Sequence, residues 1–401
     1  MTDTKPDTKP VNTPAAAATG GTNPGGHLRS LTSLRFLAAF LVFGTHAGLE
    51  SLFSDQGVGT AVNEFFGPGG RYGVSFFFVL SGFVLTWTAR PGQTARRFWR
   101  ARAAKIYPVH LVTALVAAVL LVTVAKAALD PTVVATNLLL LHGWVPRVDI
   151  MVSLNTPSWS LSCEAFFYLL FPVLLFAARR IRPSLLWLAA LASMAVVAVT
   201  PLLSEILVPT EPRLPGYGVS LEQTWFLKWF PPSHLFEFVT GILVARIIMS
   251  GKWIRFGFAP AVVLAAVGYA LITMLPFSYT FGAVTVLPTA LLIGAAAHAD
   301  ITGASTWGLR ARVPVWLGQI SFAFYMVHWL VLSFGHRWVG PGPWGVPGAL
   351  GLIAAGLAVS IVLSWALHAA VERPFVRAFG RSKRAAPHLE SEANWSHKNC
   401  E

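Results

Sequence analysis

Two ionisable side chains, Arg35 and His46, lie 11 residues apart in the first long apolar stretch, which runs from Leu31 to Leu49. At 100° per residue this spacing places both on one face of a helix, with a rise of roughly 16 Å between them. A guanidinium near one membrane surface and an imidazole deeper in the membrane suit an extended donor, with phosphates at the cation and a reactive carbonyl at the general base. Alternatively, Arg35 reaches lipid head groups and His46 hydrogen-bonds a neighbouring helix.

Two further stripes of polar side chains follow helical spacing within apolar segments. Ser160, Glu164 and Tyr168 stand at i, i+4 and i+8, so a carboxylate lies on one face of an otherwise aromatic helix. Because a carboxylate inside a membrane needs a partner, Glu164 either holds a neighbouring element or takes part in chemistry. The second stripe, at i, i+4 and i+7, favours helix packing, and it consists of Ser321, Tyr325 and His328.

Two smaller features favour packing roles. Glu237 and His234 open another apolar segment and are expected to pair with each other or with Arg71. The stretch from Gly73 to Thr88 contains small residues, including Gly82, which allow close contact between helices.

A basic segment follows this stretch, with six Lys and Arg and no acid between residues 90 and 107. We expect a loop here, ended by Pro108 at the start of the next helix. These cations offer a site for phosphates, although the positive-inside rule also explains such a cluster. The charged positions nearest the helix are Arg96, Arg97, Arg100, Arg102 and Lys105.

The elements that must position these side chains are membrane-spanning helices. The 401 residues are 55% hydrophobic and only 12% charged, which excludes an ordinary soluble domain. Apolar stretches of about 20 residues suit a bilayer core of roughly 30 Å. The sequence therefore predicts an all-α integral membrane bundle with ten spans, at residues 31–49, 72–89, 108–128, 158–178, 183–203, 232–250, 258–275, 280–298, 314–334 and 349–371.

Charge distribution orients this bundle. The apolar segment from Thr132 to Trp144 could cross the membrane or re-enter it. If it does not cross, 23 of the 30 Lys and Arg fall on the cytoplasmic side, together with both termini. We therefore predict a membrane domain over residues 30–378, with disordered cytoplasmic tails at 1–29 and 379–401.

Composition also limits partners and cofactors. The net charge of +13 lies largely at the ends of apolar segments, which favours anionic lipid head groups over nucleic acid. Cys163 stands inside an apolar segment and Cys400 is penultimate, so neither a disulfide framework nor a metal site is predicted.

Taken together, these segments resemble the acyltransferase 3 family of integral membrane O-acyltransferases. The resemblance covers about residues 28–378, in a short form that lacks an appended hydrolase-like domain. The matching motifs are LRSLTSLRFLAAFLVFGTHAG from Leu28, GVSFFFVLSGFVL from Gly73, FWRARAAKIYPVHL from Phe98, NTPSWSLSCEAFFYLLFP from Asn155, HLFEFVTGILVA from His234, LGQISFAFYMVHW from Leu317 and VERPF from Val371.

The resemblance implies particular roles for residues in these motifs. By this resemblance His46 corresponds to the catalytic histidine, Arg35 and Arg102 to conserved cations, and Glu164 to a conserved acid. In our own hypothesis for the mechanism, Glu164 orients His46. Lys105 departs from the family pattern, in which a second Arg often occupies this position, so bidentate phosphate binding there is in doubt.

The implied function is transfer of an acyl group from acyl-coenzyme A to a hydroxyl of a sugar, a glycan or a glycosylated metabolite such as a macrolide. The acyl-coenzyme A is a cosubstrate, and no bound cofactor is expected. The resemblance also implies a multi-pass protein of a bacterial cell membrane. Because intramembrane His, Glu and Arg also build proton relays, a proton-coupled secondary transporter is the alternative, although the sequence contains no repeat.

Overall fold

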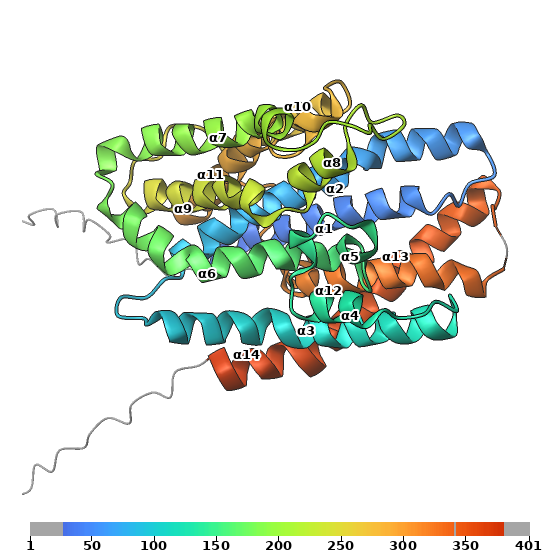
Figure 1. The fold of residues 1–401 in the computed structure, drawn as a ribbon. Coiled ribbons are helices and arrows are strands. Elements are labelled where there is room, and N and C mark those ends of the chain that lie inside the picture. Colours follow the sequence, from blue (N-terminus) through green and yellow to red (C-terminus); the bar gives the residue numbers. More distant parts are fainter. Residues whose placement is uncertain (1–26, 341, 381–401) are drawn as a thin grey trace, which may run out of the picture.

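The computed structural model describes residues 27–340 and 342–380, and these ranges are helical apart from loops and two isolated β-bridges. The helices lie side by side in one bundle (Figure 1). The two predicted tails fall outside the described residues except at their inner ends, where α1 (Arg29–Leu49) begins and α14 (Arg373–Gly380) ends. A π-helical turn, His368–Glu372, leads into α14.

Between α1 and α14 the chain alternates long helices with short connecting ones. The intervening α-helices are α2 (Gln56–Trp87), α3 (Ala95–Thr123), α4 (Pro131–Leu138), α5 (Val148–Met151), α6 (Trp159–Arg180), α7 (Leu186–Leu207), α8 (Leu221–Lys228), α9 (Leu235–Met249), α10 (Phe258–Leu271), α11 (Val286–Thr302), α12 (Arg312–Gly335) and α13 (Val346–Leu367).

The helices confirm the predicted class of a polytopic, all-α membrane protein. Eight helical segments among the described residues are long and apolar enough to cross a membrane, and α10 and α11 are shorter apolar helices. Each of these ten overlaps one predicted span. The exact number of crossings and the cytoplasmic position of both termini stay predictions. The segment 132–144 contains most of the 8-residue α4 and a 3-residue 3₁₀ helix, His142–Trp144, and at 1.5 Å per residue α4 is too short to cross.

Two helices begin earlier than the sequence pattern predicted. Helix α2 starts at Gln56, sixteen residues before the expected start, because the Asp55 side chain accepts a hydrogen bond from the Val58 amide at 3.0 Å and caps the helix. Helix α3 starts at Ala95, capped by Thr94, and continues through Pro108. The expected basic loop is therefore wrong: these cations occupy the first turns of α3.

Helix α1 packs against α2 and α12, and α2 also packs along α9. The contact of α2 with α9 depends on glycines: a Cβ atom at Gly82 would lie 2.0 Å from the Phe238 carbonyl oxygen, and one at Gly241 would lie 1.8 Å from that of Val79. The close helix contact predicted at Gly82 is thus confirmed.

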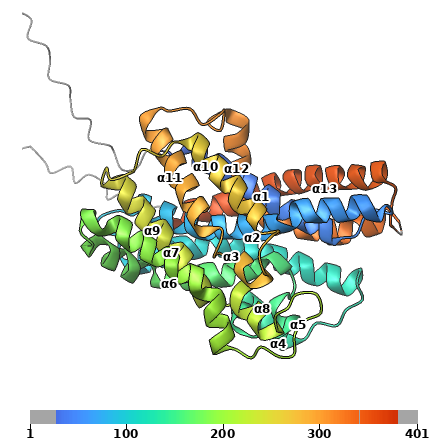
Figure 2. The same ribbon diagram turned by 90° about the horizontal axis from the view of Figure 1, so that it is seen from above.

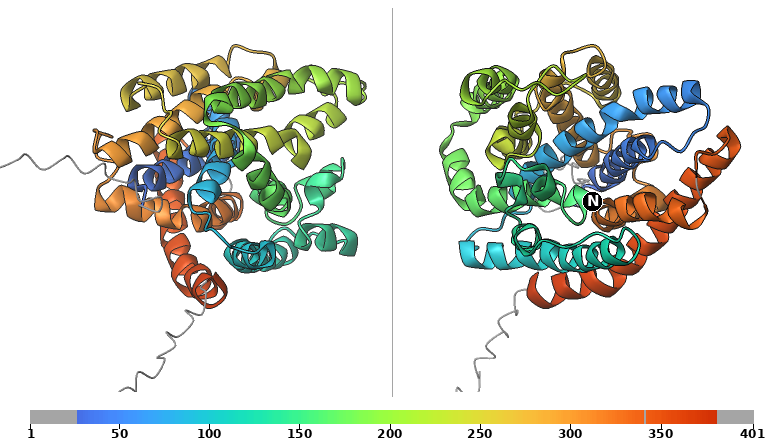
Figure 3. Two further views of the ribbon diagram at one scale, coloured as in Figure 1. Left: turned by 90° about the vertical axis from the view of Figure 1, so that its left-hand side faces the viewer. Right: turned by 45° about the vertical axis from the view of Figure 1, so that its right-hand side comes forward.

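The other helices surround this centre. Helix α3 lies at the periphery beside α14, as the two views in Figure 3 show. The short helices α4, α5 and α8 gather on one side of the bundle (Figure 2). By the predicted orientation, they lie at the exterior end of the bundle.

Candidate active site

Two histidines meet at the centre of the bundle. The Nδ1 atom of His46, from α1, lies 2.7 Å from Nε2 of His328, from α12. Their rings stack with centroids 5.0 Å apart, and the edge of Trp329 covers His46. His328 is fully buried, whereas His46 is partly exposed. Of this pair, therefore, only His46 is accessible to a substrate.

The hydrogen bonds of this pair determine which nitrogen of His46 is free. His328 Nδ1 lies 3.1 Å from the Phe324 carbonyl oxygen, which can only accept, so Nδ1 carries the proton. In a neutral ring, His328 Nε2 is then an acceptor, and His46 Nδ1 must donate to it. This leaves Nε2 of His46 with a free lone pair, as a general base requires.

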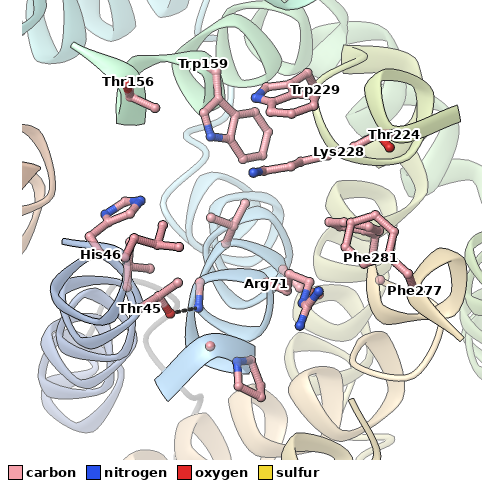
Figure 4. Close-up of a pocket in the computed structure, with 18 of the residues that line it drawn as sticks. Thr45, His46, Arg71, Thr156, Trp159, Thr224, Lys228, Trp229, Phe277 and Phe281 are labelled. Atoms are coloured by element: carbon pink, nitrogen blue, oxygen red, sulfur yellow. Dashed lines mark hydrogen bonds between the residues drawn. The ribbon is translucent and has the colours of Figure 1, made fainter. Parts of the chain in front are cut away.

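His46 opens into a cavity of about 600 Å³. The cavity lies between α1, α2, α6, α8 and α9, and Figure 4 shows His46 and Lys228 reaching into it from different helices, near Trp159. Its wall includes the aromatic rings of Trp159, Trp229, Tyr217, Phe277 and Phe281. A cavity with aromatic walls and a few polar groups is typical of a small-molecule site.

Glu237 also lines this cavity, but its oxygens are already paired. His234 Nδ1 lies 2.8 Å from Glu237 Oε2, and the Ser75 hydroxyl donates to Oε1 at 2.5 Å. Ser75 in turn accepts a hydrogen bond from Thr285 at 2.8 Å. Of the two predicted pairings of Glu237, the structure therefore has the one with His234 and not the one with Arg71.

A second polar cluster lies near the other end of α1. Arg35, Arg102 and Lys105 are close enough to Glu164 to act on it electrostatically. Lys105 forms an ion pair with Glu372, which is 1% exposed. Arg35 has no hydrogen bond or ion pair with a described residue, and Nε of Arg102 is buried without a partner. This cluster therefore holds two cations available to an anionic ligand.

Comparison with known proteins identifies the family. The model of the family described as "Acyltransferase domain" matches residues 28–369. This chain belongs to that family. It is 41% identical over 368 residues to acyltransferase MdmB of Streptomyces mycarofaciens, covering 90% of this chain and 94% of the relative. It is 26% identical over 341 residues to the exopolysaccharide production protein ExoZ of Rhizobium meliloti (strain 1021). This match covers 81% of this chain and 95% of the relative. No solved structure matches.

In this acyltransferase, Glu164 does not contact His46. Its oxygen accepts a hydrogen bond from the Tyr168 hydroxyl at 2.7 Å, one turn further along α6, and its charged neighbours are the cations of the second cluster. The expectation that Glu164 orients His46 is therefore wrong; His328 contacts His46 instead. The predicted stripe does not form one hydrogen-bonded group. Glu164 and Tyr168 bind each other, whereas the Ser160 hydroxyl donates to the Pro157 carbonyl at 3.2 Å.

The stripe on α12 is more than a packing surface in the acyltransferase. Ser321 donates to the Gly318 carbonyl of its own helix at 2.9 Å, and Tyr325 donates to the Pro157 carbonyl at 3.1 Å. These two hydroxyls bind backbone carbonyls, whereas the His328 ring contacts His46.

Sequence reasoning did not single out Glu372. It lies in the VERPF motif, where a carboxylate at the end of an apolar span was the available signal. The π-helical turn His368–Glu372 directs it toward Lys105, and His368 Nδ1 lies 3.1 Å from its second oxygen. Such turns often mark functional positions in helices.

Proposed function

We propose that this acyltransferase moves an acyl group from acyl-coenzyme A to a hydroxyl of a sugar or glycan acceptor at a bacterial cell membrane. The observation that carries the proposal is the free Nε2 of His46 at the wall of a large cavity. A thioester donor and an alcohol acceptor need such a base, because the hydroxyl must lose its proton as it attacks.

The donor is proposed to extend along α1. Arg35 and His46 lie on this one helix, separated by a rise of roughly 16 Å, which an extended pantetheine arm can cover. Arg35 and Arg102 would bind the phosphates, since neither forms an ion pair with a described residue, although the Glu164 carboxylate lies in the same cluster. Lys105 contributes less than the sequence predicted, because Glu372 already neutralises it.

In the proposed reaction, His46 Nε2 accepts the proton of the acceptor hydroxyl while that oxygen attacks the thioester carbonyl carbon. The resulting tetrahedral intermediate collapses with cleavage of the carbon–sulfur bond. His46 then returns its proton to the leaving thiolate, so ester and free coenzyme A are the products. His328 positions the imidazole throughout.

A two-step route through an acylated His46 is the alternative chemistry. Incubation of the purified protein with radiolabelled acyl-coenzyme A in the absence of acceptor separates the two routes. We expect no label on the denatured protein, as direct transfer requires. Label that survives denaturation and is absent from His46→Gln would instead establish the covalent route.

The acceptor is proposed to enter the cavity from the exterior end. Flat aromatic side chains such as Trp159 and Trp229 offer surfaces for the apolar faces of sugar rings. The name of the ExoZ relative refers to exopolysaccharide production, which supports a glycan acceptor. A glycosylated metabolite such as a macrolide would use the same surfaces.

Thiol release provides the direct test of this function. Membranes that contain the protein should release free thiol from acyl-coenzyme A when a suitable acceptor is added, and His46→Gln should not. Solute flux without thiol release, for every acceptor tried, would support the transporter alternative instead.

Substitution of Arg35 tests the position of the donor. Arg35→Ala should raise the KM for acyl-coenzyme A about 10-fold and leave the KM for the acceptor unchanged, because the guanidinium touches only donor phosphates. Arg29→Ala is the matched control, since Arg29 is an exposed cation on the same helix. A raised acceptor KM with an unchanged donor KM would overturn this assignment.

A further inference from the structure

Two cations face the cavity, where their charged groups lie over aromatic rings, and Lys228 Nζ lies 4.4 Å from the centroid of the Trp229 ring. Arg71, from α2, and Lys228, from α8, both line it, and the side chain of neither forms a hydrogen bond or an ion pair with any described residue. The Arg71 guanidinium lies over two aromatic rings, 5.6 Å from Phe277 and 5.8 Å from Phe281. Its Nε atom is buried and unpaired. Figure 4 shows both side chains reaching into the cavity.

The acids of the cavity do not neutralise this pair. Glu237 is 1% exposed and is occupied by His234 and Ser75. Glu64 is exposed, where water and salt screen its charge. The interior of the cavity therefore carries uncompensated positive charge.

Two positive charges that line one cavity repel each other. Burial and the neighbouring charge of Arg71 lower the pKa of Lys228 to about 8, because both disfavour the charged ammonium. Strained cationic pairs of this kind in a cavity are typical of functional sites. An anion bound between the two cations would remove the repulsion.

We propose that Arg71 and Lys228 form a subsite for an acidic group, a carboxylate or a phosphate, on the sugar acceptor. The inference rests on the proposed function, in which this cavity receives the acceptor. The guanidinium matches the two oxygens of such a group, and Lys228 adds a point charge. The acidic group bound here orients the sugar so that one of its hydroxyls reaches His46 in the same cavity.

A pair of matched ligands tests the subsite without requiring catalysis. Methyl β-glucuronide and methyl β-glucoside differ only at C6, which is a carboxylate in the glucuronide and a hydroxymethyl group in the glucoside. Saturation-transfer NMR with the purified full chain in detergent should show glucuronide binding about 10-fold tighter than glucoside binding. Lys228→Met and Arg71→Met should each reduce glucuronide binding to the glucoside level, and Lys228→Arg should retain it.

The control is Arg213→Gln, which removes an exposed cation outside the cavity wall and should change neither ligand. Equal binding of the two ligands by the wild-type protein, or glucuronide binding that survives both Met variants, would overturn the subsite. Loss of glucoside binding in the Met variants would also overturn it, because it would indicate a general change of the cavity.

A kinetic measurement distinguishes binding of the acceptor's acidic group from binding of the donor's phosphates. Lys228→Met should raise the KM for an acidic acceptor and leave the KM for acyl-coenzyme A unchanged. A fall in kcat with unchanged acceptor KM would mean that the cation acts on the reacting oxygen, and weakened binding of adenosine 3′,5′-bisphosphate would mean that it holds the donor. Either result overturns the inference. Failure of the proposed function gives a different result from failure of the subsite. In that case glucuronide would still bind, but no acceptor would cause thiol release.

Discussion

Replacement of His46 by glutamine should lower kcat by roughly 10²- to 10⁴-fold, the usual contribution of a general base. The glutamine amide keeps a hydrogen-bond donor for the contact between α1 and α12, although it lies one bond further from the backbone than Nδ1 of the imidazole. It cannot accept a proton at neutral pH, so only the chemistry is lost. The measurements are thiol release at saturating substrates and thermal stability in detergent.

His298→Gln is the matched control for His46→Gln. His298 lies on α11, outside the residues that line the cavity, so its replacement should leave kcat near the wild-type value. If His46→Gln kept more than about a tenth of the wild-type rate, His46 would not be the base. His328 could not simply replace it, because His328 is fully buried and its Nε2 faces His46.

The sequence carried enough information to predict the helical bundle and to single out one of the two histidines that meet in the candidate site. Spans follow from apolar length, and the charge rule predicted that residues 132–144 do not cross, which is consistent with the 8-residue length of α4. His46 was a candidate because an imidazole in an apolar helix is rare, although a hydrogen bond to a neighbouring helix was the alternative.

The partners of the site residues could not be predicted from spacing. His46 and His328 are 282 positions apart, and Lys105 and Glu372 are 267 apart, so no helical periodicity relates the members of either pair. Spacing within one helix correctly placed Tyr168 near Glu164, yet the same rule also grouped Ser160, which hydrogen-bonds a loop carbonyl. Contacts between helices depend on how the helices pack, which single-helix patterns do not contain.

The error at the start of α3 has a specific cause. Proline is common in the first turn of a helix, and this preference led to Pro108 as the predicted start. In a membrane helix an internal proline is tolerated, because neighbouring groups can satisfy the freed backbone carbonyl. The threonine cap at Thr94 was the better signal, since its side chain accepts a hydrogen bond from the Arg97 amide at 3.4 Å.

Removal of Lys105 and removal of Glu372, which form an ion pair, should lower the stability of the protein by different amounts. Lys105→Met leaves a carboxylate that is 1% exposed, and it should lower the free energy of unfolding by about 3 kcal/mol. Glu372→Gln leaves an ammonium whose side chain is 28% exposed and can turn toward water, so we expect a loss of about 1 kcal/mol. Denaturant titration in detergent micelles measures both changes.

The double variant Lys105→Met, Glu372→Leu is the control for this ion pair. It leaves no buried charge at the pair, so its stability should return to near the wild-type value.

The Glu372→Gln variant also tests donor binding. If Glu372 neutralises Lys105 as the structure indicates, Glu372→Gln should free the ammonium and lower the KM for acyl-coenzyme A. For stability, an equal loss in Lys105→Met and Glu372→Gln would contradict the expected difference between them, because it would mean that the Lys105 ammonium cannot reach water. A donor KM raised by Glu372→Gln would show instead that the carboxylate positions Lys105 for the phosphates.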